Sequence, residues 1–254
     1  MKARSRSSST PAKRSKARHP SRQAKACTKG EVLRELKRLA DPKVRAKMAY
    51  FGVNVPKAHG ISAPVLHSLA RHIGRSQQLA EQLWSSGIHE ARILATLIGE
   101  SEKVSAALMD RWARDFDSWD VVDSACCYLF AAAAPAWRKI HEWARCQPEF
   151  QKRAAFSLAA YLSYKDKIAD DTRFERFLAV IEREAHDGRN FVRKAVDWAL
   201  RNIGKRNLRL NKLAIATAER IRKQNSRSAR WIAADALREL KSKAVQNRLR
   251  RKAG

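Results

Sequence analysis

The sequence has few cysteines and no pattern of cysteine or histidine that indicates a metal site. Its four cysteines, Cys27, Cys126, Cys127 and Cys146, form no CxxC pair and no framework spacing. A chain of 254 residues can bury a core without disulfide staples, so this usage predicts free thiols and a reducing compartment. The seven histidines are scattered without the spacing of zinc ligands. We therefore expect no metal and no other cofactor.

Long apolar runs and alternating apolar segments are lacking as well. No stretch approaches the ~18 apolar residues of a membrane-spanning helix, and the N-terminus has no apolar segment of the signal-peptide kind. Segments of period two that are rich in β-branched residues, which would predict strands, are essentially absent. These absences predict an all-α protein with no membrane partner, located in the cytoplasm and, in a bacterium, associated with the nucleoid.

Acidic residues are scarce relative to basic ones. Lys and Arg number 53 against 25 Asp and Glu, which gives a formal charge of +28. Residues 1–30 hold ten basic and no acidic residues, and the stretch after Glu239 holds six basic and none acidic. About +12 remains on the middle of the chain. A basic core of this kind predicts a polyanionic partner such as nucleic acid. The alternative is that the charge only aids solubility.

Composition divides the chain into three parts. Residues 1–28 are rich in Ser, Arg, Lys and Pro without periodic apolar residues, which predicts a disordered basic arm. A transit peptide shares this composition. We expect the folded domain to span 29–241 and a basic tail to span 242–254. Within the domain, residues 51–64 contain two glycines and two prolines, which predicts an irregular loop between two helices.

Apolar residues recur at helical spacing from residue 63 onward. Leu66, Leu69, Ala70 and Ile73 form one apolar stripe, and Gly74 follows as a C-terminal cap. The same periodicity predicts further helices over residues 77–85, 89–99, 103–114, 119–133, 136–145, 149–164, 172–186, 190–203, 209–223 and 226–241.

These helices repeat. Arg92, Arg153, Arg193 and Arg230 each lie near the start of a helix rich in Ala and aliphatic residues. Asp123 lies 31 residues after the first arginine and 30 before the second, and the next two intervals are 40 and 37. Paired helices with a period of roughly 30–47 residues are typical of an α-solenoid of the HEAT or armadillo kind. We expect the second helices of the repeats to line a concave basic face, in a protein that is a monomer.

Asp123 stands where the neighbouring repeats carry arginine. Trp119 precedes it by four residues, which on a helix places the indole directly above the carboxylate. A single acid on a basic face is a candidate for chemistry, and nearby cations should keep it ionised at neutral pH. The alternative is structural: Asp123 caps its helix or forms a salt bridge with an adjacent arginine.

Four segments carry a family resemblance. They are Tyr-Phe-Gly-Val-Asn at 50–54, His-Glu-Ala-Arg-Ile-Leu-Ala at 89–95, Ser-Trp-Asp-Val-Val-Asp at 118–123, and Asn-Phe-Val-Arg-Lys-Ala-Val-Asp-Trp-Ala-Leu-Arg-Asn-Ile-Gly-Lys-Arg-Asn at 190–207. Together they resemble the DNA alkylation repair proteins, HEAT-like-repeat DNA glycosylases that act on alkylated purines. The resemblance spans roughly residues 48–241.

The resemblance implies a site formed by Trp119, Asp123 and Trp198, with Arg153 in contact with DNA. Relatives tend to have an aromatic residue where this chain has Ser118, and some branches of the family bind DNA with weak or no glycosylase activity. The implied partner is duplex DNA containing alkylated purines, with the duplex on the concave face and the lesion left unflipped, whereas most glycosylases flip the base. Without the resemblance, Trp119 and Trp198 would each be assigned to the core. The other five tryptophans are expected to pack between helices: Trp84, Trp112, Trp137, Trp143 and Trp231.

The expected chemistry needs only one carboxylate. A purine alkylated at N3 or N7 carries positive charge and leaves without protonation. Negative charge then stabilises the oxocarbenium-like sugar, and the same carboxylate can orient the water that captures it. Indole faces attract a cationic base by ~0.5–2 kcal/mol.

Several basic residues are candidates for contact with DNA: Arg92, Arg153, Arg193, Lys194, Lys205, Arg206 and Arg230. The run 204–207 predicts a helix cap followed by a basic loop, although a simple turn is an alternative. Two other functions remain open. A non-catalytic HEAT-like module would bind DNA or RNA through the basic face, and a scaffold for protein partners would fit the solenoid but not the charge.

Overall fold

The described part of the chain is wholly helical. The computed structural model describes residues 27–253, and the expected arm over 1–28 lies almost entirely outside them. Fourteen α-helices and no strand occur within that range. They are α1 (Lys29–Arg38), α2 (Pro42–Tyr50), α3 (Ala63–Ile73), α4 (Gln77–Trp84), α5 (His89–Ile98), α6 (Ala106–Arg114), α7 (Trp119–Ser124), α8 (Ala136–Trp143), α9 (Glu149–Lys165), α10 (Asp171–Glu184), α11 (Asn190–Gly204), α12 (Leu208–Arg222), α13 (Arg227–Leu240) and α14 (Lys243–Ala253). None of the helices in this range is long and apolar enough to cross a bilayer.

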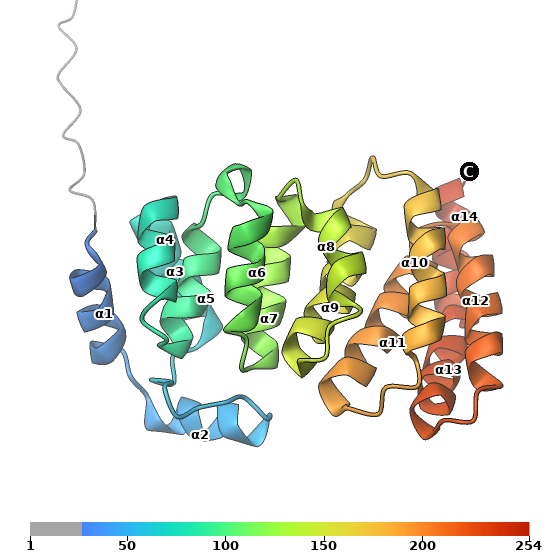
Figure 1. Cartoon of the computed structure of the whole chain (residues 1–254), viewed down its shortest axis with the longest axis horizontal. Helices are drawn as coiled ribbons and strands as arrows, with labels where there is room; N and C mark the ends of the chain where they lie inside the picture. Colours follow the sequence, from blue (N-terminus) through green and yellow to red (C-terminus); the bar gives the residue numbers. More distant parts are fainter. Residues whose placement is uncertain (1–26, 254) are drawn as a thin grey trace, which may run out of the picture.

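The helices stand side by side in an elongated array, with α1 at one end and α12–α14 at the other (Figure 1). One row consists of α5, α7, α9, α11 and α13, and each of these helices contacts the next. Arg92, Asp123, Arg153, Arg193 and Arg230 lie on these five helices in that order. The α-solenoid and the repeat alignment are therefore confirmed, because the aligned positions occupy equivalent helices of one row.

Aromatic side chains pack between the helices of the array. Trp84 stacks on Trp112 with ring centroids 4.0 Å apart, and Trp143 and Trp137 also pack against the core. The expectation that these four tryptophans pack between helices is confirmed. For Trp231 it is wrong: its side chain is 39% exposed, because its ring lies under a guanidinium at the surface rather than between helices.

The helix predicted over 119–133 is interrupted. Regular α-helix ends at Ser124, a π-helical turn covers Ala125–Leu129, and a short 3-10 turn follows. Cys126 is buried in this turn and its thiol contacts the carbonyl oxygen of Ala154. Cys126 is therefore part of the core, Cys127 is half-buried, and all four cysteines are free, as predicted. A π-helical turn often marks a functional position in a helix, and here it begins two residues after Asp123.

The predicted loop over 51–64 is confirmed, and it holds α2 against the array. Glu90, fully buried on α5, accepts hydrogen bonds from the backbone N–H groups of His59, Gly60 and Ile61 at 2.7–3.3 Å. Gly60 has φ +83°, and a Cβ there would lie 2.2 Å from the carbonyl oxygen of Asp41. Only glycine permits this close approach.

The segment after residue 241 is not a tail. It forms α14, whose apolar residues Val245 and Leu249 are buried against α12 and α13. The folded domain therefore extends beyond the boundary expected from composition. The high density of basic residues hid the two buried apolar positions, which are four residues apart and lie on one face of the helix.

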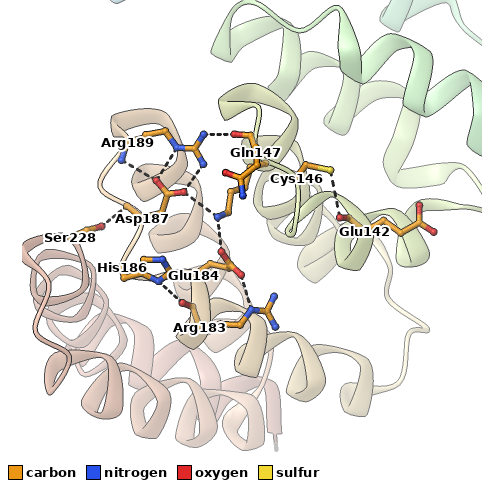
Figure 2. Close-up of polar contacts among 10 residues, drawn as sticks. Glu142, Cys146, Gln147, Arg183, Glu184, His186, Asp187, Arg189 and Ser228 are labelled. Carbon is orange, nitrogen blue, oxygen red and sulfur yellow. Dashed lines mark hydrogen bonds and ion pairs between the residues drawn. The ribbon is translucent and has the colours of Figure 1, made fainter.

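A network of ion pairs fixes the loop between α10 and α11. Lys152 of α9 is buried and contacts Glu184 at 2.6 Å and Asp187 at 3.1 Å. Arg189 also binds Asp187 and donates to the carbonyl oxygen of Gln147, as Figure 2 shows. These contacts tie the loop that starts α11 to the N-terminal end of α9.

Candidate functional site

Two side chains of α9 hold the carboxylate of Asp123. Its Oδ2 lies 2.7 Å from Nη2 of Arg153, and its Oδ1 accepts a hydrogen bond from the Ser157 hydroxyl at 2.9 Å. Arg153 also donates to the carbonyl oxygen of Phe191 at 2.9 Å, which links α7, α9 and α11 through one guanidinium. The Asp123 side chain is 18% exposed, and that of Arg153 is 7% exposed. The carboxylate is therefore oriented by α9 but still reachable.

The salt bridge with an adjacent arginine, which the sequence left open, is present. Burial raises the pKa of Asp123 above its usual value, although Arg153 and the Ser157 hydroxyl oppose the shift. From the sequence we expected nearby cations to favour the charged form of Asp123. In the structure burial outweighs them, because removing a carboxylate from water disfavours its charged form. Ser157 was not predicted. Its only sequence signal is its position one helical turn after Arg153.

Trp119 shares a cavity with Asp123. The indole N–H donates to the carbonyl oxygen of Phe51 at 3.1 Å, so the loop after α2 fixes the half-buried ring. A cavity of about 330 Å³ lies beside it, and Asp123 and Tyr161 also line this cavity, together with residues of α2, α3 and α5. The one-turn spacing on α7 thus places indole and carboxylate on one wall, as the sequence predicted.

Trp198 of α11 lines a second cavity beside Asp123. Its ring packs edge-on against Tyr161, with centroids 4.9 Å apart. The second cavity, of about 370 Å³, is lined by Trp198, Asp123 and Lys194 among others. Asp123 therefore lies between two cavities, with Trp119 in one and Trp198 in the other. The structure brings the three predicted residues together, and it adds Tyr161, which sequence reasoning missed.

Comparison with known families identifies the chain. The model of the family described as "DNA alkylation repair enzyme" matches residues 32–243. This chain belongs to the DNA alkylation repair enzyme family. No curated protein matches it.

One solved structure is similar to this member of the DNA alkylation repair enzyme family. It is described as "A new family of proteins related to the HEAT-like repeat DNA glycosylases with affinity for branched DNA structures". The TM-score is 0.71 at 18% sequence identity, and the match covers 88% of this chain and 96% of that chain. At this identity the likeness shows the fold, an all-helical HEAT-like repeat array.

A second polar pair lines the cavity beside Trp119. Nε2 of His89 lies 2.9 Å from Oδ2 of Asp120, and the buried Ser118 hydroxyl donates to Oδ1 at 2.6 Å. Burial alone would raise the pKa of Asp120, but its contact with His89 outweighs burial and lowers it. In this member of the DNA alkylation repair enzyme family, the Ser118 hydroxyl thereby orients the Asp120 carboxylate.

Four of the predicted DNA contacts have partners inside the protein. Arg92 donates to the carbonyl oxygen of Asp115 at 2.9 Å, and Arg153 is bound to Asp123. Lys205 contacts Glu239 at 2.7 Å. Arg206 donates to four backbone carbonyl groups, one near the end of α9 and three in the α9–α10 connection. These contacts favour structural roles and the turn alternative for residues 204–207.

The other three predicted contacts are more available. Lys194 and Arg230 are exposed, and within residues 27–253 neither has a side-chain ion pair or hydrogen bond. Lys194 lines the cavity that holds Trp198 and Asp123. The guanidinium of Arg193 lies 4.5 Å from the centre of the Trp231 ring. These three residues belong to α11 and α13, beside the candidate site.

Asp197, the neighbour of Trp198, forms a salt bridge with Arg201. It is buried, with Oδ2 2.9 Å from Arg201. Burial raises its pKa to about 7, with Asp235 adding to the shift and Arg201 opposing it. No group of three or more His, Cys, Asp and Glu that could hold a metal occurs within residues 27–253.

Proposed function

We propose that this protein is a DNA glycosylase that hydrolyses the N-glycosidic bond of positively charged N3- and N7-alkylated purines in duplex DNA. One observation carries the proposal: an oriented, partly accessible carboxylate, Asp123, lies between cavities lined by Trp119 and Trp198. Membership of the DNA alkylation repair enzyme family supports it. The partner would be duplex DNA, bound by a monomer.

In the proposed reaction the bond between the sugar C1′ and the purine nitrogen breaks, and its electron pair leaves with the base. The cationic base thereby becomes neutral and needs no general acid. Positive charge develops on the sugar, and a carboxylate about 4 Å away stabilises it by up to about 4 kcal/mol at an effective dielectric constant near 20. Water then adds to C1′, and Asp123 accepts the proton that this water loses.

Three residues, Arg153, Ser157 and Phe51, would hold the side chains of the proposed site in position. Arg153 and Ser157 hold the Asp123 carboxylate, so it need not reorient during the reaction. The bond to Phe51 fixes the ring of Trp119, and a fixed indole face attracts a cationic base or sugar by ~0.5–2 kcal/mol. Selectivity for cationic lesions would follow from the rings and the carboxylate together.

A non-catalytic DNA-binding module is the second candidate. The solved structure with a similar fold is described as having affinity for branched DNA, and the Asp123–Arg153 pair could be purely structural. Release of 7-methylguanine or 3-methyladenine from methylated duplex DNA separates the two. Release by the wild-type protein supports the glycosylase, whereas tight duplex binding without release overturns it in favour of the module.

The acid limb of the pH–rate profile tests the role of Arg153. Because the reaction needs ionised Asp123, excision should fall as the pH drops through its raised pKa. Arg153→Met removes the cation that opposes this shift, so the pKa should rise further and the limb should move to higher pH. Single-turnover rates across pH measure this. Arg193→Met, which removes a guanidinium beside Trp231 instead, should leave the limb in place. An unmoved limb in Arg153→Met would contradict the assignment.

Salt dependence of binding tests the exposed cations. Lys194→Ala/Arg230→Ala should flatten the log–log slope of duplex affinity against salt by about 1.8, since each phosphate contact contributes about 0.9. Fluorescence anisotropy with an undamaged duplex measures the slope. Lys212→Ala/Lys223→Ala removes two exposed cations of α12 and its C-cap and should leave the slope unchanged. Equal slopes for both double variants would show that Lys194 and Arg230 make no phosphate contacts with the duplex.

A further inference from the structure

A stripe of side chains runs along α9 away from the candidate site. Arg153, Ser157, Tyr161 and Tyr164 follow one another at intervals of four, four and three residues, so they share one face of the helix. The first two bind Asp123, and the last two lie toward the other end of α9. At 1.5 Å per residue, the stripe is about 16 Å long.

Aromatic rings dominate the far half of this stripe. We call Tyr128, Tyr161 and Tyr164 the tyrosine ridge. The rings of Tyr161 and Tyr164 meet with centroids 5.7 Å apart, and Nζ of Lys165 lies 5.8 Å from the ring centres of both Tyr128 and Tyr161. Tyr128 is 43% exposed and Tyr164 is 41% exposed. Tyr128 and Tyr164 therefore present ring surface to solvent, where a ligand can pack against it.

The ridge ends at a basic cavity. This cavity of about 680 Å³ is lined by residues of the α9–α10 connection, the end of α11 and α14. Its lining includes Tyr164 and five basic residues: Lys167, Lys205, Arg206, Arg248 and Lys252.

Three of these five cations have no side-chain partner in the part of the chain that the structure describes. Lys205 and Arg206 are bound to Glu239 and to backbone carbonyl groups, as described above. Lys167, Arg248 and Lys252 are exposed, and among residues 27–253 none of them makes a side-chain hydrogen bond or ion pair. The acid of the lining, Asp171, is already bound by Arg206 and Asn207. The cavity therefore has an excess of positive charge.

The basic residues of α14 contribute to this positive charge although they repel one another. Arg248 and Lys252 are one turn apart on a helix that contains no acidic residue, and like charges at this spacing destabilise a helix. Val245 and Leu249 dock the helix, which holds both cations at the cavity. Phosphate groups are ligands that would offset such repulsion.

We propose that a single-stranded segment of DNA leaves the duplex at the candidate site, stacks its bases on the tyrosine ridge and places its phosphates in the basic cavity. The position of the duplex rests on the proposed function, whereas the ridge and the cavity do not. Interleaved aromatic rings and lysines are typical of single-strand binding, because every base has a face that can stack. The bases of an intact duplex have no free faces to offer the ridge. The protein should accordingly bind a duplex with a single-stranded extension more tightly than a blunt duplex.

Fluorescence anisotropy with undamaged oligonucleotides tests this preference. The probes are a blunt duplex and the same duplex with a single-stranded extension of either polarity. Arg248→Ala/Lys252→Ala should weaken binding of one extended duplex about tenfold and flatten its salt slope by about 1.4, since each single-strand phosphate contributes about 0.7. Tyr164→Ala should weaken the same complex about fivefold or more, the effect of losing one stacked base. Binding of the blunt duplex should stay within about twofold.

The matched control lies on the same helix. Arg250→Ala/Arg251→Ala removes the same charge from α14 at exposed positions that do not line the cavity, and should change extended-duplex affinity less than about twofold. Equal losses in both double variants, or equal losses on blunt and extended DNA, would overturn the proposal. Absence of excision with a retained preference for the extension would refute the proposed glycosylase and leave the strand path standing.

Discussion

Asp123→Asn should lower the rate of 7-methylguanine release from methylated duplex DNA by at least about 100-fold, the size of effect typical when a pre-oriented electrostatic group is removed. The amide keeps the size of the side chain and can still contact Arg153 and Ser157, but it carries no negative charge. It can neither stabilise the developing positive charge on the sugar nor accept the proton of water. Single-turnover release at neutral pH measures the rate, and duplex affinity should stay nearly unchanged.

The control for this variant is Asp117→Asn. It makes the same chemical change at an exposed carboxylate just before α7, whose partner is Arg92. Asp117→Asn should release base at close to the wild-type rate. Equal release by wild type and Asp123→Asn would remove Asp123 from the mechanism. A parallel loss of folding or duplex affinity in Asp123→Asn would assign the Asp123–Arg153 pair a structural role instead.

Lys152→Met should destabilise the fold by about 3 kcal/mol, because it removes the ammonium group between two buried carboxylates. Glu184 and Asp187 would keep Arg183 and Arg189 as partners, but each would lose a buried contact. Denaturant unfolding followed by circular dichroism at neutral pH measures the change. Lys212→Met, the same substitution at an exposed position of α12, should change stability by less than about 0.5 kcal/mol.

The pH dependence of that loss has a defined sign. Although burial alone would raise them, the pKa values of Glu184 and Asp187 are lowered in the fold, because Lys152, Arg183 and Arg189 bind their carboxylates. Groups with a lowered pKa stabilise the fold above their unfolded pKa of about 4, and this stabilisation is lost as the pH falls through their folded pKa. The difference between wild type and Lys152→Met should therefore shrink below about pH 4. A difference that stays constant with pH would indicate lost packing of the lysine stem rather than lost charge.

Local patterns predicted most of the helices. The apolar stripes of α4, α5 and α8–α13 depend on residues close together in the chain, so the predicted bounds agree with the structure within a few residues. The segment 119–133 is different. Its composition predicts one continuous helix, but the structure has a π-helical turn. Two contacts with α9 accompany this turn: the buried Cys126 thiol contacts a backbone carbonyl of α9, and the Cys127 carbonyl accepts a hydrogen bond from Lys165. Packing against another helix is invisible in a single segment.

The candidate site was predictable in position and only partly in detail. The spacing of Trp119 and Asp123, and the family resemblance for Trp198, located its three members. Tyr161 and Ser157 were missed because each shows only as an ordinary residue in an apolar helix. Their roles arise from what lies opposite them on α7 and α11.

The sequence by itself determined the all-α class, the repeat, the basic charge and the place of Asp123 within that repeat, because each is a matter of composition or of spacing along one chain. Only the tertiary structure decided the state of that acid. Whether a carboxylate among cations has a lowered or a raised pKa depends on the balance of burial and contact, and that balance exists only once α7, α9 and α11 pack together. The same packing gave four of the seven expected DNA contacts partners within the fold. It also left three cations of the basic cavity, Lys167, Arg248 and Lys252, without a side-chain partner among residues 27–253.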